Sequence, residues 1–201
     1  MNHATAAAAA DRTRERFPTS AEPWLLAGLA RARLGEAEAA VPLLEKAVAS
    51  GGAPEARLEL ARVLATLGRA AEALAALDGT PVPGPEERLI RADLLNGIGR
   101  LEEALEACDS ALAAAGVARD VAHHRKARIL LDAGRPKDAL AALDAAIGVN
   151  PEEEEYWCDA AVAWRALGRE TRAQRMLDGA LRINPSSTRA RALRAVVPAS
   201  P

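Results

Sequence analysis

The residues most capable of chemistry in this sequence are few, and they do not form a recognisable catalytic or metal-binding pattern. His123 and His124 are adjacent, but neighbouring residues of a helix point about 100° apart, which is poor geometry for one metal ion. Cys108 and Cys158 lack the short spacing of a metal or redox motif. The sequence therefore predicts no enzyme activity, no bound metal and no cofactor.

An acidic run at 152–155 follows Asn150 and Pro151, where a helix is expected to begin. Carboxylates at that place complement the positive end of the helix dipole. We therefore interpret the run as structural, or at most as an exposed acidic ledge, and not as a catalytic carboxylate pair.

The composition is typical of closely packed helices. Half of the 201 residues are hydrophobic, only 2% are aromatic, and about a quarter are alanine, which favours helix and lets helix axes approach closely. The formal charge is −2, with 26 basic and 28 acidic residues, so no overall positive field attracts nucleic acid. Arginines do gather in the last third of the chain, and a nucleic-acid or acidic partner there is the weaker alternative.

The sequence also bears on location. Cysteines without a disulfide pattern favour a reduced, cytoplasmic setting. The apolar segment 4–10 is short and has no basic residues before it, so we expect no signal peptide. No stretch approaches the ~20 apolar residues needed to cross a bilayer. Frequent alanine and arginine indicate a bacterial source with GC-rich DNA.

The elements that would position these residues are repeated along the chain. A turn glycine recurs at steps of 33, 31, 35 and 34 residues, at Gly35, Gly68, Gly99, Gly134 and Gly168. Five residues after each glycine stands an alanine: Ala40, Ala73, Ala104, Ala139 and Ala173. Nine residues after it stands Leu44, Leu77, Cys108, Leu143 or Leu177. This period predicts stacked helix pairs, each turning at its glycine.

The first unit resembles the tetratricopeptide repeat, a helix–turn–helix unit, through Trp24, Gly28, Gly35, Ala40, Leu44 and Ala47. The units at 120–153 and 154–187 match that signature better. Those at 54–84 and 85–119 have Arg57 and Arg88 where tryptophan stands in the first and fifth units.

The resemblance implies an all-α fold, a right-handed α-solenoid of five helix pairs. We expect units at 21–53, 54–84, 85–119, 120–153 and 154–187. A half-repeat helix and linker are predicted at 1–20, and a capping helix with a frayed tail at 188–201.

The junction at 78–85 departs from the repeat, because its alternating prolines forbid helix and shorten the second unit. Two interpretations are open: a tight connector that adjusts the superhelical twist, or a hinge or contact loop.

In the family, the first helices of successive units line a concave groove. Transferred by position, the partner-binding residues are Leu25, Leu29, Leu58, Arg62, Leu89, Asp93, Asn96, His124, Arg128, Cys158, Val162 and Arg165. An amphipathic helix or extended peptide would place apolar side chains on the leucines and an acidic group on Arg62 or Arg128. Alternatively, the leucines pack against neighbouring helices or against a second copy of the chain.

The family's clamp for EEVD-type chaperone tails is absent, because the chain has Leu25, Leu29, Glu59, Glu86 and Ile90 at its positions. The sequence therefore predicts a non-enzymatic adaptor or scaffold whose partner is a segment of another protein, other than such a tail. A self-assembling scaffold, forming homo-oligomers, is the main alternative.

Overall fold

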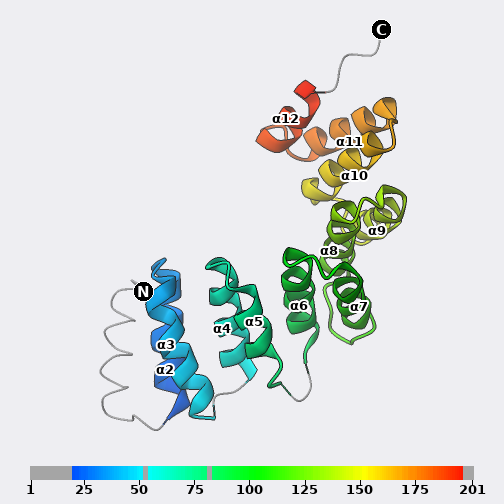
Figure 1. Cartoon of the computed structure of the whole chain (residues 1–201). Coiled ribbons are helices and arrows are strands. Elements are labelled where there is room, and N and C mark those ends of the chain that lie inside the picture. Colours follow the sequence, from blue (N-terminus) through cyan, green and yellow to red (C-terminus); the bar gives the residue numbers. More distant parts are fainter. Residues whose placement is uncertain (1–19, 52–53, 81–82, 197–201) are drawn as a thin grey trace. The chain divides into compact units, whose positions relative to one another are not determined.

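The computed structural model describes residues 20–51, 54–80 and 83–196. Every regular element within these ranges is an α-helix, so the predicted all-α fold is confirmed (Figure 1). The chain divides into two compact units, Met1–Pro83 (unit 1) and Gly84–Pro201 (unit 2). The predicted half-repeat helix at 1–20 and the tail after residue 196 lie outside the described residues.

The described residues of unit 1 form two helix pairs. They are formed by α2 (Ala21–Arg33) with α3 (Ala37–Ala49), and by α4 (Pro54–Thr66) with α5 (Ala70–Leu77). Helix α4 packs against both helices of the first pair, so the second pair stacks on the first. Helix α5 has only 8 residues, in agreement with the early stop predicted from the proline-rich junction.

Between residues 84 and 196, unit 2 contains three helix pairs and one further helix. The pairs are α6 (Pro85–Gly97) with α7 (Leu101–Leu112), α8 (Arg119–Asp132) with α9 (Pro136–Val149), and α10 (Glu154–Ala166) with α11 (Glu170–Ile183). Helix α12 (Thr188–Val196) packs on α11 and α10, as expected of a capping helix. The first helices also contact one another directly, α6 with α8 and α8 with α10.

The predicted turn glycines end the first helix of each pair in the same way. Gly35 has φ of 79°, and its N–H donates to the carbonyl of Ala32 at 3.0 Å. The next N–H, of Glu36, reaches back to the carbonyl of Arg31, also at 3.0 Å. This pair of bonds is the Schellman motif, which needs a left-handed residue and so favours glycine. The same bonds recur at Gly68, Gly99, Gly134 and Gly168.

The core is built from the residues that follow each glycine by five and nine positions. All five alanines of the first set and all five members of the second set are buried, with at most 1% exposed. Burying one leucine side chain contributes roughly 1.5–3 kcal/mol, so a repeated row of them is a large share of the stability. Close helix approach also requires small residues, since a Cβ on Gly28 would lie 2.6 Å from Cγ of Leu44.

Candidate functional site

Unit 1 has a hollow on the side formed by its first helices, between α2 and α4. Its volume is about 320 Å³, and its apolar lining comes from Leu29 and Ala32 of α2 and from Val63 of α4. A space of this size accommodates one or two side chains of a ligand. The lining also contains Arg62, so two predicted groove residues from different repeats lie at one hollow.

Charged side chains surround this apolar lining. Arg33 and Arg62 bring two guanidinium groups, and Glu59 brings one carboxylate, whose Oε1 is 3.8 Å from Nη1 of Arg62. The hydroxyl of Thr66 already has a hydrogen-bond partner, because it donates to the carbonyl of Val63 at 2.7 Å. The hollow therefore combines an apolar floor with a net positive rim.

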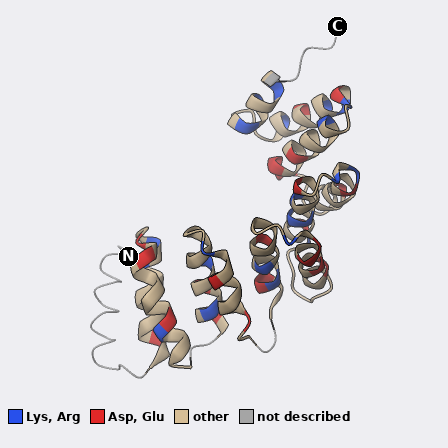
Figure 2. Cartoon of the chain, viewed as in Figure 1, with Lys and Arg blue, Asp and Glu red and all other residues tan. Residues whose placement is uncertain are grey.

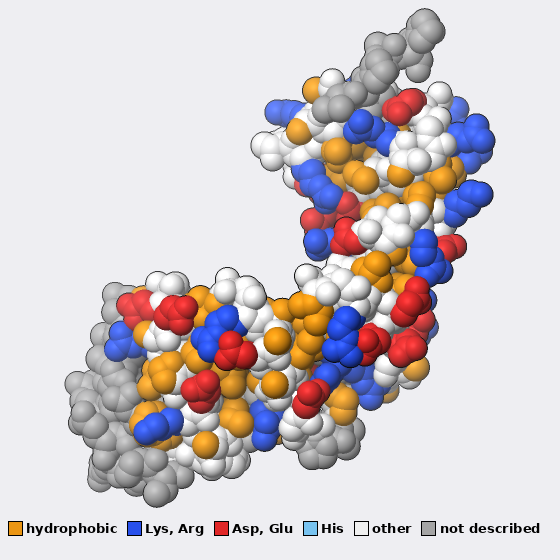
Figure 3. All heavy atoms as spheres, in the orientation of Figure 1, with side chains coloured by type: hydrophobic (Ala, Val, Ile, Leu, Met, Phe, Trp, Pro, Cys, Tyr) orange, Lys and Arg blue, Asp and Glu red, His pale blue; other side chains and the backbone are white. Residues whose placement is uncertain are grey.

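Two further predicted groove residues in unit 1 are half-buried on the same two helices. Leu25 belongs to α2 and Leu58 to α4, and neither is among the residues that line the hollow. Both retain part of their surface in contact with solvent. On the face turned to the viewer in Figure 3, such apolar side chains are interspersed with charged ones.

In unit 2, three of the predicted groove residues are buried and do not line a surface. Leu89 is 5% exposed, His124 is 7% exposed and Cys158 is completely buried. His124 is covered because α8 contacts α10, where its partner Asp159 lies. Cys158 packs in a cluster with Leu177 of α11 and Ala190 of α12. These three side chains therefore contribute to the packing in this structure and, unlike Leu29 and Arg62, they are not exposed groove residues.

His124 contributes to a buried polar network that the sequence did not reveal. Its Nε2 lies 2.6 Å from Oδ2 of Asp159, which is 3% exposed on α10. An ionised carboxylate can only accept, so Nε2–H of the imidazole donates. The other oxygen of Asp159 accepts from Arg189 of α12, which also pairs with Glu155 at 3.2 Å. The network joins α8, α10 and the capping helix.

The negative charge of the Asp159 carboxylate is stabilised by the groups that donate hydrogen bonds to it. Burial acts to raise the pKa of Asp159, but the hydrogen bond from His124 and the charge of Arg189 outweigh it, so the pKa is lowered. Next to it, the ring of Tyr156 lies 4.6 Å from that of His124, and its hydroxyl donates to Asp120 at 3.2 Å. These contacts consequently link α8 to α10 within the scaffold.

In unit 2, the exposed side chains of α6 and α8 lie one helical turn after the buried residues Leu89 and His124. There Asp93 of α6 pairs with Arg125 of α8, and Nδ2 of Asn96 donates to Asp132 at 2.7 Å. Arg128 follows Arg125 and precedes Asp132 in the sequence of α8. Its side chain is exposed and makes no hydrogen bond with another described residue. Its positive charge acts on the carboxylate of Asp93 and opposes the effect of burial on the pKa of that group.

Helix α10 carries the last two predicted groove residues. Val162 and Arg165 are both half-buried, and Nε of Arg165 lies 4.0 Å from Glu170 at the start of α11. Neither is sealed in the core, so both keep surface that a partner can reach.

The two thiols are unsuited to chemistry. Both are buried and unpaired. Burial, with smaller contributions from nearby carboxylates, raises the pKa of Cys108 to about 12. Burial likewise raises the pKa of Cys158 to about 11, although Arg189 acts in the opposite direction. A thiol that stays protonated and inaccessible is a small apolar packing residue.

Many arginines of the last third have partners within the protein. Arg191 donates to the carbonyl of Pro185, and Arg194 pairs with Asp178 at 3.5 Å. Arg172 stacks on the ring of Trp164 at 4.5 Å from its centroid. These three arginines therefore take part in contacts within the fold.

Comparison with known families agrees with the geometry. A model described as tetratricopeptide repeat matches residues 31–94 and 130–197, and a second model with the same description matches residues 2–54. The first model alone covers more than half of the chain. The chain belongs to the tetratricopeptide repeat family. Repeat proteins of this family act as scaffolds for interactions between proteins, and we take this as the general class of its activity.

Several solved structures of tetratricopeptide repeat architecture are similar. PilW, a type IV pilus biogenesis factor, superimposes with a TM-score of 0.84 at 18% identity over 96% of this chain and 90% of PilW. YrrB, described as having an unusual peptide-binding site, gives 0.70 at 19% identity over 95% of this chain and 100% of YrrB. MamA from Desulfovibrio magneticus RS-1 gives 0.73 at 18% identity, covering 84% and 97%. At these identities the likeness shows the fold alone.

A comparison with the curated proteins gives no match. None of the helices in the described part of the chain has the length and apolar character needed to cross a membrane.

Proposed function

We propose that the chain is a non-enzymatic adaptor that binds a peptide or helical segment of another protein on the exposed faces of its first helices. The observation that carries the proposal is the hollow in unit 1, where Leu29 and Arg62 from successive repeats line one space. This arrangement has the two parts that peptide recognition needs, an apolar recess and a charged group beside it.

The chemistry of the hollow defines the segment it would accept. An apolar side chain of the partner would rest on Leu29, Ala32 and Val63, where it is removed from water. A carboxylate next to it in the partner would approach Arg33 or Arg62 at the rim. In unit 2, Arg128 offers a further guanidinium to an acidic group. The favoured partner is thus an apolar segment with acidic residues.

The comparisons support the general class of this function. The family is one of protein-interaction scaffolds, and the similar structure YrrB is described as a peptide-binding protein. A cytoplasmic site of action is part of the proposal, and it follows from the composition and the unpaired thiols.

Selection from a phage-displayed peptide library, followed by anisotropy measurements on the selected peptides, tests this function. We expect selected sequences to pair an apolar residue with an adjacent Asp or Glu. Leu29→Asp should weaken their binding about tenfold or more, because it places a second carboxylate in the recess.

The matched control is Leu26→Asp, on the same helix but at a side chain that is 49% exposed and does not line the hollow. Equal losses in both variants would assign the effect to the charge or to the fold of α2. Selected peptides that bind Leu29→Asp as well as the natural chain would refute the proposed site.

A further inference from the structure

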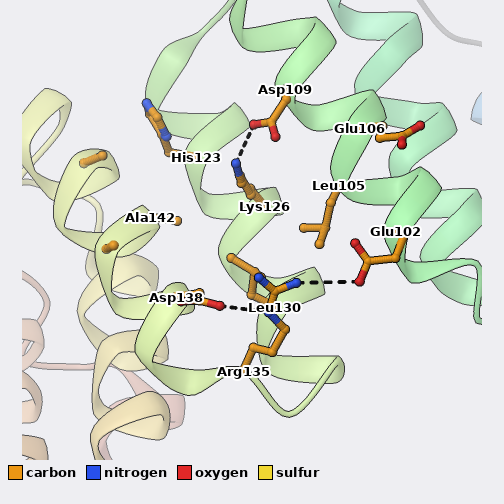
Figure 4. A pocket seen from close by; sticks show the side chains of 12 residues that line it. Glu102, Leu105, Glu106, Asp109, His123, Lys126, Leu130, Arg135, Asp138 and Ala142 are labelled. Atoms are coloured by element: carbon orange, nitrogen blue, oxygen red, sulfur yellow. Dashed lines mark hydrogen bonds and ion pairs between the residues drawn. The ribbon is translucent and has the colours of Figure 1, made fainter.

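Unit 2 has a second hollow, on the side formed by the second helices and therefore separate from the proposed peptide site. It lies between α7 and α9, with α8 beneath, and its volume is about 550 Å³ (Figure 4). We refer to it as the α7–α9 hollow. Its size matches that of sites that accept several side chains of a ligand.

The base of the α7–α9 hollow is apolar. Leu105 of α7 and Leu130 of α8 stand together there, and Ala142 of α9 lies opposite them (Figure 4). All three are buried in the core, with 3–8% of their surface exposed, so they present only their edges to the hollow. The α9 side is completed by Ala141 and Ala145, which are not fully buried. Because these side chains end at Cβ, the backbone of a docked helix can approach α9 closely.

Carboxylates stand along the α7 side of the hollow. Glu102, Glu106 and Asp109 are spaced at i, i+4 and i+7, which places them on one face of the helix. Helix α7 contains no basic residue at all, and acidic residues visibly gather on it (Figure 2). Asp138 adds a fourth carboxylate from α9.

The cations of the hollow do not balance this charge. Nζ of Lys126 pairs with Asp109 at one end, and Arg135 pairs at the other end with Asp138 at 2.8 Å and Glu102 at 3.7 Å (Figure 4). Glu106 has no hydrogen bond or ion pair within the described residues. The lining therefore has an excess of negative charge, and one carboxylate has no partner.

His123 is the remaining titratable side chain of the hollow, and it does not offset the negative charge. Burial, followed by the charges of Arg119 and Lys126, lowers the pKa of His123 below its usual value, so the imidazole is neutral at pH 7. A neutral ring leaves the negative excess in place.

We infer that the α7–α9 hollow docks a cationic amphipathic helix of a partner protein. A Lys or Arg of that helix pairs with Glu106, and the adjacent apolar side chains contact Ala141 and Ala145 and the small exposed edges of Leu105 and Leu130. Charge complementarity selects this occupant over an acidic or a purely apolar segment. The inference does not depend on the proposed peptide site, which is lined by different helices and has the opposite sign of charge.

A labelled peptide of leucine and lysine, arranged as an amphipathic helix, provides the probe. Its fluorescence anisotropy should rise with the full-length chain. The charge-reversed peptide of leucine and glutamate should not displace it, and any binding of that acidic peptide should be weakened by Leu29→Asp. Glu106→Lys should weaken binding of the lysine peptide about tenfold or more. The matched control is Asp144→Lys, an exposed site on α9 that changes the net charge equally but does not line the hollow.

The location of binding is tested independently by amide chemical shifts in NMR spectra. Shifts confined to α7, α8 and α9, with Leu29→Asp leaving affinity unchanged, would support the inference. No binding of the lysine peptide, equal losses in Glu106→Lys and Asp144→Lys, or shifts centred on α2 and α4 would each overturn it. Mass doubling in light scattering without the peptide, abolished by Glu106→Lys, would assign the hollow to a second copy of the chain and overturn it as well.

Discussion

Cys108 and Cys158 show how a reactive residue type becomes part of a core. Cys108 stands at the position that other repeats fill with leucine, and Cys158 packs in the cluster with Leu177 and Ala190. A thiol at such a position meets no solvent, and the raised pKa keeps it protonated.

Both thiols should therefore react with Ellman's reagent only when the chain unfolds. At mildly alkaline pH we expect the native protein to release almost no chromophore, and both cysteines to react at once in concentrated urea. The stopped-flow absorbance trace in the two solvents measures the difference. A fast-reacting thiol in the native chain would show that its helix opens or that the burial assigned here is wrong.

Asp159 is the residue whose loss we expect to cost the most. Its carboxylate is buried and accepts from His124 and Arg189, so removing it leaves the buried His124 without its acceptor and leaves Arg189 with Glu155 alone. Asp159→Ala should lower the free energy of unfolding by roughly 3–5 kcal/mol. Urea unfolding followed by circular dichroism measures this, with Asp144→Ala, an exposed carboxylate, as the control.

The same residue predicts an acid dependence. Because the folded-state pKa of Asp159 is lowered, its contribution is present above the unfolded carboxyl value of about 3.9 and is lost as the pH falls through the folded pKa. We expect Asp159→Asn to be less stable than the natural chain at pH 7 and to lose less stability on acidification. Parallel acid-dependence curves for the two proteins would contradict the role of this network.

Among the helices, the turn glycines make the clearest case for local sequence control. Gly134 has φ of 69°, and a Cβ there would meet nothing within 4 Å, so only backbone conformation opposes a side chain. Gly134→Val should destabilise by roughly 1–3 kcal/mol, the cost of a strained backbone. Gly148→Ala in α9 is the control, since that glycine is helical, has no close neighbour and should gain up to about 1 kcal/mol. A melting temperature of Gly134→Val equal to that of the natural chain would contradict this account.

The helix pattern could be read from the sequence because its determinants are local. Each turn glycine, the alanine five residues on and the apolar residue nine residues on act within one helix pair, and all are where they were predicted. The short α5 follows equally from the prolines after Asp78.

The site could be predicted only in part, because exposure depends on how neighbouring helices approach. Leu29 and Arg62 do line a hollow, whereas Leu89, His124 and Cys158 are buried. Position in the repeat is the same for Leu58 and His124, yet only the second is buried, so register alone does not separate them. The partners Asp159 and Arg189 are 30 residues apart, and no local pattern links them.

For the whole chain, the choice between an adaptor and a self-assembling scaffold depends on the free surface. Stable interfaces between copies bury about 1,200–2,000 Å² around an apolar centre. The large exposed apolar residues of the described chain are Leu26, Leu34, Ile98 and Val149, which belong to different helices and turns. Scattered single side chains of this kind are ordinary surface and do not make an interface.

We therefore expect the chain to be a monomer of 21.1 kDa in light scattering across the micromolar range. The physical reason is that a peptide-binding surface must stay open, and the interspersed charges on the visible face would be desolvated by a second copy (Figure 3). A measured mass that rises towards twice this value with concentration would favour self-assembly. In that case Leu29→Asp should restore the monomer if the hollow between α2 and α4 is the contact, whereas Glu106→Lys should do so if the contact is the α7–α9 hollow.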